Sequence, residues 1–343
     1  MTKVPEILMI YTGGTIGMIK DYESNALKAF DFDHLYEKIP ELNQLTCNIE
    51  SISFAEPIDS SNMNTKYWVD IIEIIEKYYE EKDGFVVLSG SDTMAYTSSA
   101  ISFMIENLTK PIIFTGSQLP IGDLRTDAKE NLITAVQIAA STNKNGEPNI
   151  KEVGIYFEYK LYRANRTTKI SAEQFEAFAS PNYPPLAESG VHLKFNKNLI
   201  WLDTSNEKVN FIKKLENNIV VLKLFPGITK NVVSHILNIP DLKAVVLETY
   251  GSGNAPTQKW FISLLEEALL QGIHIVDITQ CNIGSVILGQ YKTSIQLQKI
   301  GLINGKDMTT EAALAKLMYL LGKEIETLEF KNAFETSLRG EVS

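Results

Sequence analysis

The chain is poor in the residues that build disulfide frameworks, metal centres and histidine-based catalytic sites. Its 343 residues include only two cysteines, Cys47 and Cys281, and four histidines. Two cysteines cannot make a disulfide framework or a zinc site. We therefore expect both to be reduced thiols in a reducing compartment, and the spacing of histidines and cysteines predicts no metal.

Positive charge and long apolar segments are also scarce. The net charge of −10 argues against nucleic acid as a main partner, because phosphate binding needs clustered lysine and arginine. No apolar run approaches the roughly 18–20 residues of a membrane span. Only the short run 7–11 precedes the first polar loop, and a signal peptide needs roughly 7–15 apolar residues. The sequence therefore predicts a cytoplasmic protein with no membrane partner.

What the chain does contain is a repeated alternation of two patterns. Short apolar runs that end in glycine- or hydroxyl-rich loops are typical of buried parallel strands. Segments with apolar residues at three- and four-residue spacing lie between them and predict helices. The expected strands are 7–11, 85–88, 112–114, 153–157, 218–222, 244–247 and 273–276, and the expected helices are 67–79, 94–107, 127–140, 229–238, 257–271 and 310–321. This alternation predicts an α/β fold with parallel-rich sheets.

The length and one polar stretch predict two domains. At roughly 150 residues per domain, the chain has room for about two. A polar segment rich in asparagine and lysine separates the two sets of alternating elements. We expect a larger N-terminal catalytic domain at 1–193, a linker at 194–216, and a smaller, flavodoxin-like C-terminal domain at 217–343.

Ligands in open α/β sheets bind outside the carboxyl ends of the strands, so the loops after the first strands are the place to expect a site. The first loop holds Gly13 and Gly14, which allow a sharp bend that can expose Thr15. A plain tight turn is the alternative interpretation. The glycine spacing fits neither a phosphate loop nor a dinucleotide fingerprint.

A hydroxyl nucleophile needs a group that takes its proton. None of the histidines lies in these loops, and His274 falls in an apolar strand and is expected to pack in the core. Lysine is the remaining candidate, because burial favours its neutral form. A cluster of Ser91, Lys169 and Asp92 could pass a proton, with Asp92 holding the lysine; an ordinary surface lysine is the alternative.

A further polar loop, Asp59-Ser60-Ser61, follows Pro57. Its carboxylate and hydroxyls could bind the amino and carboxylate groups of a small zwitterion. The alternative is a helix cap, because serine and aspartate commonly begin helices.

Taken together, the motifs are more specific than any one of them. The runs at 11–17 and 90–96 resemble the two signature loops of the asparaginase family. Further runs resemble its cytoplasmic, type I branch, and the resemblance extends over essentially the full chain: 115–118, 124–127, 165–169, 178–182, 250–256 and 338–341.

The resemblance implies hydrolysis of L-asparagine to L-aspartate and ammonia without a cofactor. It implies that Thr15 is the nucleophile, that Ser91, Asp92 and Lys169 handle protons and orient water, and that Asp59, Ser60, Ser61, Ser91 and Asp92 bind the substrate. The family is oligomeric, so we expect a homodimer or homotetramer, with Asn254 close to a neighbouring subunit's site.

Three positions depart from the family pattern. Ser91 stands where the family usually has threonine, which keeps the hydroxyl but loses the methyl that fixes its rotamer. Ala26 falls where a loop tyrosine assists the nucleophile, and Tyr22 is a nearby substitute. Glu248 stands where some type I enzymes carry an arginine of an allosteric asparagine site, so we expect no activation through that site.

Three alternatives remain open. The first is a dual glutaminase–asparaginase, because its two substrates differ by one methylene, which a pocket distinguishes by roughly 1–3 kcal/mol. A tRNA-dependent amidotransferase subunit shares the motifs, but we expect it to carry an additional N-terminal domain. A non-catalytic amino-acid sensor of the same fold would not require Thr15 and Lys169.

Overall fold

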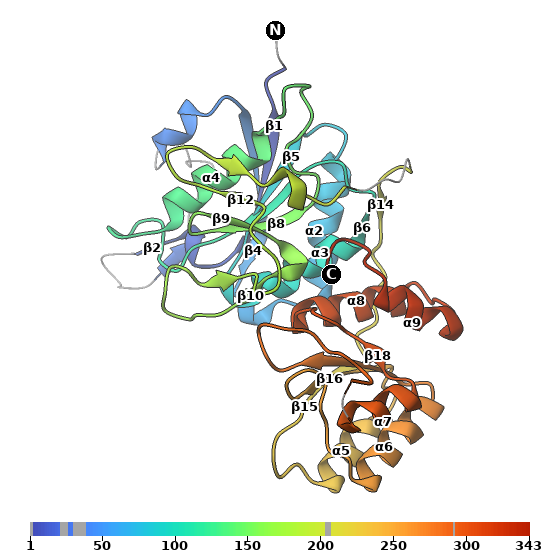
Figure 1. The fold of residues 1–343 in the computed structure, drawn as a ribbon. Helices are drawn as coiled ribbons and strands as arrows, with labels where there is room; N and C mark the ends of the chain where they lie inside the picture. Colours follow the sequence, from blue (N-terminus) through green and yellow to red (C-terminus); the bar gives the residue numbers. More distant parts are fainter. Residues whose placement is uncertain (1–2, 21–26, 30–38, 203–206, 291) are drawn as a thin grey trace. The chain divides into compact units, whose positions relative to one another are not determined.

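The computed structural model describes residues 3–20, 27–29, 39–202, 207–290 and 292–343. The chain divides into two compact units, Met1–Lys213 and Lys214–Ser343 (Figure 1). Both are α/β structures in which parallel strands predominate, which confirms the predicted fold class.

The first unit is built on an eight-stranded sheet with the order β13-β12-β9-β8-β7-β5-β1-β4. Five neighbouring strands, from β8 to β4, run parallel, and β9, β12 and β13 continue the sheet in antiparallel pairs. The strands of this sheet are β1 (Glu6–Gly13), β4 (Asn48–Ile58), β5 (Gly84–Leu88), β7 (Ile112–Thr115), β8 (Val153–Phe157), β9 (Lys160–Arg163), β12 (Ala187–Glu188) and β13 (Lys194–Phe195).

Among the described residues, α-helices cover both faces of this sheet, with α4 on one face and α2 and α3 on the other (Figure 1). Alternate residues of β1, Ile7, Met9 and Tyr11, pack in one core with Leu132 and Ala135 of α4. The helices are α2 (Thr65–Tyr78), α3 (Met94–Met104) and α4 (Ala128–Ala140), with short 3-10 helices η1 (Thr15–Gly17), η3 (Pro40–Gln44), η4 (Ser60–Asn62), η5 (Ser91–Thr93), η6 (Ala164–Arg166) and η7 (Lys197–Leu199). Three two-stranded pairs complete the unit: β2 (Met18–Lys20) with β3 (Leu27–Ala29), β6 (Ile105–Glu106) with β14 (Asn210–Phe211), and β10 (Thr168–Lys169) with β11 (Phe178–Ala179).

The second unit is a four-stranded, fully parallel sheet with the order β15-β16-β17-β18. Alternate residues Val245 and Leu247 of β16 pack in one core with Phe261 and Leu265 of the helix α6. Its elements are β15 (Ile219–Lys223), α5 (Lys230–Leu237), β16 (Ala244–Thr249), α6 (Lys259–Leu270), β17 (His274–Thr279), α7 (Lys292–Ile300), β18 (Ile303–Asn304), α8 (Thr310–Gly322) and α9 (Thr327–Glu335).

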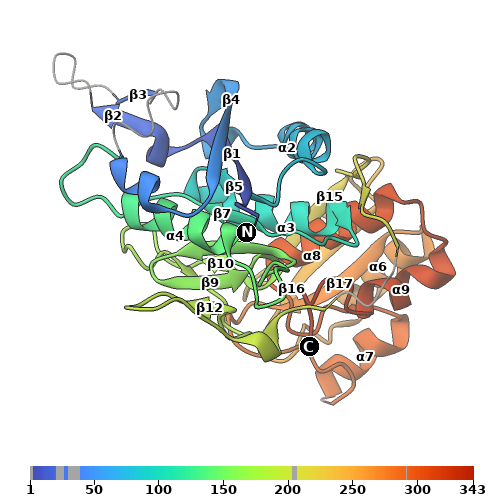
Figure 2. The same ribbon diagram turned by 90° about the horizontal axis from the view of Figure 1, so that it is seen from above.

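The strand β4 is the main element that the apolar pattern did not predict. It is the longest strand, with 11 residues, and it forms one edge of the sheet next to β1 (Figure 2). Most of its residues are exposed or half-buried, because an edge strand is covered on fewer sides than a central one. Its sequence therefore mixes charged and apolar residues and lacks the continuous apolar run of β5.

Part of the stretch expected as a linker, 194–216, forms strands of the first unit. The strand β13 pairs with β12, and β14 pairs with β6. The segment between them is held by Glu152, whose carboxylate accepts the backbone N–H of Trp201 at 2.8 Å. Polar composition suggested a linker, but the described residues of this stretch include two strands that pair with strands of the first unit.

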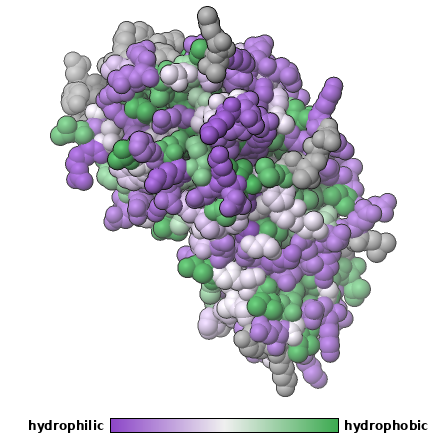
Figure 3. Space-filling view, turned by 45° about the horizontal axis from the view of Figure 1, so that its top comes forward, coloured by the Kyte–Doolittle hydropathy of each residue, from purple (hydrophilic) through white to green (hydrophobic). Residues whose placement is uncertain are grey.

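The surface seen in Figure 3 is mostly hydrophilic, with hydrophobic residues scattered among charged ones. Within the described ranges, no helix is both long enough and apolar enough to cross a membrane.

Candidate active site

The loop that carries Thr15 depends on two glycines. Gly13 and Gly14 adopt φ angles of 137° and 91°, which residues with a side chain rarely adopt. A Cβ atom on Gly13 would lie 2.1 Å from the backbone oxygen of Ile58. The hydroxyl of Tyr11 donates to the carbonyl of Gly17 at 3.2 Å and holds the far side of the loop. The loop is thus a tight turn that begins η1 at the half-buried Thr15.

Gly14 and Gly90 let three loops of the unit meet. A Cβ atom on Gly14 would lie 2.4 Å from the Cα of Gly90, so the Thr15 loop touches the loop after β5. A Cβ atom on Gly90 would lie 2.5 Å from the Oγ of Ser60. The hydroxyl of Thr93 donates to the carbonyl of Ser60 at 2.8 Å. These contacts bring the loops of Thr15, Ser91 and Asp59–Ser61 to one place at the carboxyl ends of β1 and β5.

Ser91 and Asp92 lie at the start of a helical segment. They form η5, which runs directly into α3. The N-terminus of a helix carries partial positive charge and stabilises carboxylates and developing negative charge nearby. This position places the Ser91 hydroxyl and the Asp92 carboxylate at that terminus.

Lys169 joins the two residues. Its Nζ donates to the Oγ of Ser91 at 2.9 Å and to the Oδ1 of Asp92 at 2.6 Å. The lysine side chain is 16% exposed and the aspartate side chain 67% exposed. The cluster predicted from the sequence is therefore formed by a half-buried lysine and an accessible carboxylate at the edge of the site.

The segment that precedes Lys169 is hydrogen-bonded to α3, the helix that follows Ser91. The hydroxyl of Ser99, on α3, donates to the carbonyl of Ala164 in η6 at 3.3 Å. The hydroxyl of Thr167 donates to the carbonyl of Arg163 at 2.7 Å, which closes the turn before β10. These bonds connect the segment before Lys169 to α3, the helix that follows Ser91.

The loop Asp59–Ser61 has both features that the sequence suggested. The Oδ1 of Asp59 accepts the backbone N–H of Ser61 at 2.9 Å and its hydroxyl at 2.8 Å, so the aspartate caps η4. These hydrogen bonds lower the pKa of Asp59. Asp59 and Ser61 are exposed and Ser60 is buried against Gly90. The cap therefore leaves an ionised carboxylate open to a ligand.

Other hydroxyls at the strand ends serve the backbone. Thr12 donates to the carbonyl of Leu88 at 3.1 Å, Thr115 to Tyr156 at 2.8 Å and Ser117 to Leu119 at 2.6 Å. Their hydrogen bonds fix the loops from which the site is built, and Ser91 is the hydroxyl that contacts the lysine.

One residue of the site had no predicted role. The Oε1 of Gln118, in the loop after β7, accepts the hydroxyl of Ser91 at 3.2 Å. The family-like motifs at 115–118 and 124–127 were the available signal. The two motifs contact each other in the structure. The carboxylate of Asp127, from the second motif, accepts the backbone N–H groups of Gln118, from the first motif, and of Leu119 at 2.9–3.1 Å.

Two predicted positions lie outside the described residues, namely Tyr22 and Ala26. His274 is half-buried at the start of β17, where its ring stacks on Phe330 with centroids 3.9 Å apart. Burial lowers the pKa of His274. Among the side chains that the structure describes, no group of three acidic, histidine or cysteine residues could hold a metal ion.

Glu248, in the second unit, is already paired. Its Oε1 accepts the hydroxyl of Thr310 at 2.7 Å, and its Oε2 lies 3.2 Å from the Nζ of Lys223. Glu248 itself stands at the position where the resemblance implies an arginine of an allosteric site in some relatives, and here its carboxylate is bound to side chains of the same unit. The absence of activation through this position stays a prediction.

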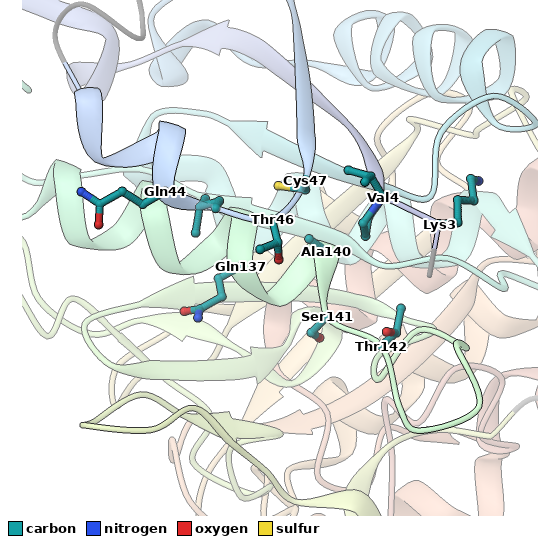
Figure 4. Close-up of a pocket in the computed structure, with 11 residues that line it drawn as sticks. Lys3, Val4, Gln44, Thr46, Cys47, Gln137, Ala140, Ser141 and Thr142 are labelled. Atoms are coloured by element: carbon teal, nitrogen blue, oxygen red, sulfur yellow. The ribbon is translucent and has the colours of Figure 1, made fainter. Parts of the chain in front are cut away.

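A separate cavity of about 600 Å³ lies at the opposite end of the first sheet (Figure 4). It is lined by residues that precede β1 and β4 and follow α4, among them Val4, Thr46, Cys47 and Ser141. Burial raises the pKa of Cys47, which disfavours the thiolate. None of the predicted site residues lines this cavity.

The comparisons with known proteins agree with this arrangement. The family model described as "Asparaginase, N-terminal" matches residues 6–201, and the "Glutaminase/Asparaginase C-terminal domain" model matches residues 218–334. The chain is 42% identical over 338 residues to L-asparaginase 1 of Escherichia coli, covering 98% of each chain. The crystal structure of L-asparaginase I from Vibrio cholerae matches with a TM-score of 0.91 and 39% identity, covering 99% of each chain.

A second solved structure, the thermostable L-asparaginase from Thermococcus kodakarensis, matches with a TM-score of 0.88 and 30% identity over 98% of this chain and 99% of that one. With the two α/β units, these matches define the chain as an α/β amidohydrolase. It belongs to the asparaginase family.

Proposed function

We propose that this chain hydrolyses the side-chain amide of L-asparagine to give L-aspartate and ammonia, with Thr15 as the nucleophile. The observation that supports this most strongly is the contact of Lys169 with both Ser91 and Asp92, beside a glycine-built loop that presents Thr15. A pure binding site would need neither the lysine contact nor a second hydroxyl.

The reaction begins at Thr15. Its oxygen attacks the amide carbon and loses its proton, and the carbonyl oxygen takes on negative charge. Backbone N–H groups near Thr15 and Ser91 stabilise that oxygen, and one such donor typically contributes about 2.7–4 kcal/mol. The carbon–nitrogen bond then breaks, the proton given up by Thr15 passes to the leaving nitrogen, and ammonia departs while an aspartyl ester remains on Thr15.

Water completes the reaction through the second cluster. Ser91 and Lys169 orient the water and take its proton, while Asp92 holds the lysine through its 2.6 Å contact. The water oxygen forms a bond to the ester carbon, the bond to the threonine oxygen breaks, the proton taken from the water passes to that oxygen, and aspartate is released. No cofactor takes part in this scheme.

The substrate's charged ends have suitable partners. The carboxylates of Asp59 and Asp92 are both exposed and suit the α-amino group. The hydroxyls of Ser60 and Ser61 suit the α-carboxylate. Discrimination against L-glutamine depends on room for one methylene, which is worth roughly 1–3 kcal/mol, so a dual glutaminase–asparaginase is the alternative that differs least.

We also propose that the enzyme works as a homodimer or homotetramer in the cytoplasm. The family resemblance and the two reduced cysteines support this. Light scattering of the purified chain measures the oligomeric state.

The decisive experiment compares ammonia release from asparagine and glutamine over a concentration series for the wild type, Thr15→Ala and Thr15→Ser. Removal of a nucleophile lowers turnover by orders of magnitude, and Thr15→Ser keeps a hydroxyl and should retain part of the activity. Near-normal turnover by Thr15→Ala would show that another residue attacks the amide. Binding of asparagine without ammonia release by the wild type would identify a sensor.

A further inference from the structure

Gln118 connects three separate loops at the site. Its side-chain oxygen accepts the hydroxyl of Ser91 at 3.2 Å, and its side-chain nitrogen donates to the carbonyl of Gln174 at 3.0 Å. Gln174 lies between β10, which ends at Lys169, and β11. The glutamine therefore bridges the serine of the cluster and the loop that follows its lysine.

The chemistry of the partners determines the direction of each hydrogen bond. A backbone carbonyl can only accept, so the amide nitrogen of Gln118 must face Gln174 and its oxygen must face Ser91. The Nζ of Lys169 donates to the oxygen of Ser91 at 2.9 Å, so this oxygen is an acceptor toward the lysine. The single proton of Ser91 then points at Gln118, and a lone pair of the same oxygen faces the lysine.

The backbone of Gln118 is itself held rigidly. The carboxylate of Asp127 accepts its N–H at 2.9 Å, and the side chain of Asn131 donates both to Asp127 at 3.2 Å and to the carbonyl of Gly116 at 3.0 Å. These bonds fasten the loop after β7 to the first turn of α4. The amide oxygen of Gln118 is thus a fixed acceptor and not a mobile surface group.

Serine needs such an acceptor more than threonine does. The χ1 angle of serine can occupy three staggered positions, and the methyl of threonine restricts this choice. We propose that Gln118 is a positioning residue that selects the rotamer and the proton direction of Ser91, replacing the restriction that a threonine methyl provides in relatives. This inference rests on the proposed function, because it concerns the hydroxyl that assists the hydrolysis.

The test is a two-by-two set of variants: wild type, Gln118→Met, Ser91→Thr and the double variant. Methionine has a similar length and removes the acceptor. We expect Gln118→Met to lower kcat for asparagine about three- to tenfold, from the lost hydrogen bond and the added rotamer freedom. In the Ser91→Thr background the same substitution should change kcat by less than about twofold, since the methyl restricts the hydroxyl.

Gln174→Ala is the matched control, because Gln118 contacts only the backbone carbonyl of that residue, and its kcat should equal that of the wild type. Equal losses in the two backgrounds would overturn the proposal, because they would mean that Gln118 only holds the loop. An unchanged kcat in Gln118→Met would overturn it as well. Failure of the proposed function is a different result, since the wild type itself would then release no ammonia.

Discussion

Each unit of the molecule contains a lysine–carboxylate pair at short distance, and the two pairs differ in how far their side chains are exposed. Lys169 and Asp92 in the first unit have side chains that are 16% and 67% exposed. Lys316 and Glu341 in the second unit are both 0% exposed. A difference of this size separates a pair that can meet substrate and water from a pair that cannot.

The partners of the two lysines differ in the same way. The Nζ of Lys316 donates to the carbonyls of Phe334 and Thr336, both at 2.6 Å, and to the carboxylate of Glu341. All three ammonium protons are thus used. The Nζ of Lys169 has two acceptors among the described residues, which leaves its remaining position for a ligand or water. The buried pair stabilises the fold, and the accessible pair is suited to catalysis.

The largest expected effect is on turnover. Lys169→Met should lower kcat for asparagine by about 10²–10⁴-fold, because positioned proton transfer contributes that much. The urea midpoint should move little, because the pair is largely accessible and such pairs contribute little to stability. Steady-state rates and urea unfolding of one preparation measure both quantities. A variant that loses its fold together with its activity would contradict the distinction between the two pairs.

For the buried pair we expect the opposite result, a loss of stability with little change in turnover. Lys316→Met should lower the free energy of unfolding by about 3–5 kcal/mol, because it leaves Glu341 as an uncompensated buried charge. Turnover per folded molecule should stay within about twofold of the wild type. Burial lowers the pKa of Lys316 and the charge of Glu341 opposes this shift, so the pair depends on both partners.

The double variant Lys316→Met with Glu341→Gln provides the control. The neutral amide removes the buried charge and can still accept the backbone N–H of Leu338, which the glutamate accepts at 3.0 Å. It should therefore recover part of the lost stability. If the double variant unfolds at the same urea concentration as Lys316→Met, the loss comes from packing and not from charge.

These pairs also show what could be predicted from the sequence. The α/β fold follows from continuous apolar runs, because buried parallel strands need them on both faces. Ser91 and Asp92 were expected at the site because they follow β5, which ends at the carboxyl edge of the parallel strands, whereas Lys169 follows the antiparallel strand β9 and was expected there from its motif. The role of Glu341 was not, since nothing local to the motif at 338–341 indicates that it accepts from Lys316, 25 residues away.

The strand β4 and Gln118 escaped prediction for related reasons. An edge strand alternates too loosely to be distinguished from a loop, and β4 is mostly exposed or half-buried. Gln118 acts through bonds to Ser91 and Gln174, which come from separate loops. Contacts between loops depend on the exact ends of the strands, which are the least certain part of any pattern.

A buried carboxylate without a lysine extends the comparison. Asp277, on β17, is 0% exposed and accepts only the hydroxyl of Thr249 at 2.7 Å, and its Oδ2 has no partner among the described residues. Burial raises its pKa to about 7. A raised folded-state pKa means that stability is greatest when the group is protonated and falls as the pH rises from about 4 to about 7.

Asp277→Asn removes this titration. Between pH 5.5 and 8, the variant should gain stability relative to the wild type by on the order of 2 kcal/mol, from about 1.36 kcal/mol per pH unit. Urea unfolding at several pH values measures the difference. A difference that does not vary with pH would mean that Asp277 is already ionised in the folded state.

The smallest effect is expected at a fully accessible pair, Lys214 and Glu324, whose side chains are 66% and 76% exposed. Lys214 donates a hydrogen bond that lowers the pKa of Glu324. A lowered folded-state pKa contributes stability at pH values above the group's normal pKa. This contribution is lost as the pH falls through the folded-state pKa. Because water and salt screen both charges, Lys214→Met should leave the urea midpoint unchanged within error and raise only the pKa of Glu324. NMR titration of the glutamate and urea unfolding measure the two effects. A clear loss of stability would show that the exposed fraction of a lysine–carboxylate pair does not predict how much the pair contributes to stability.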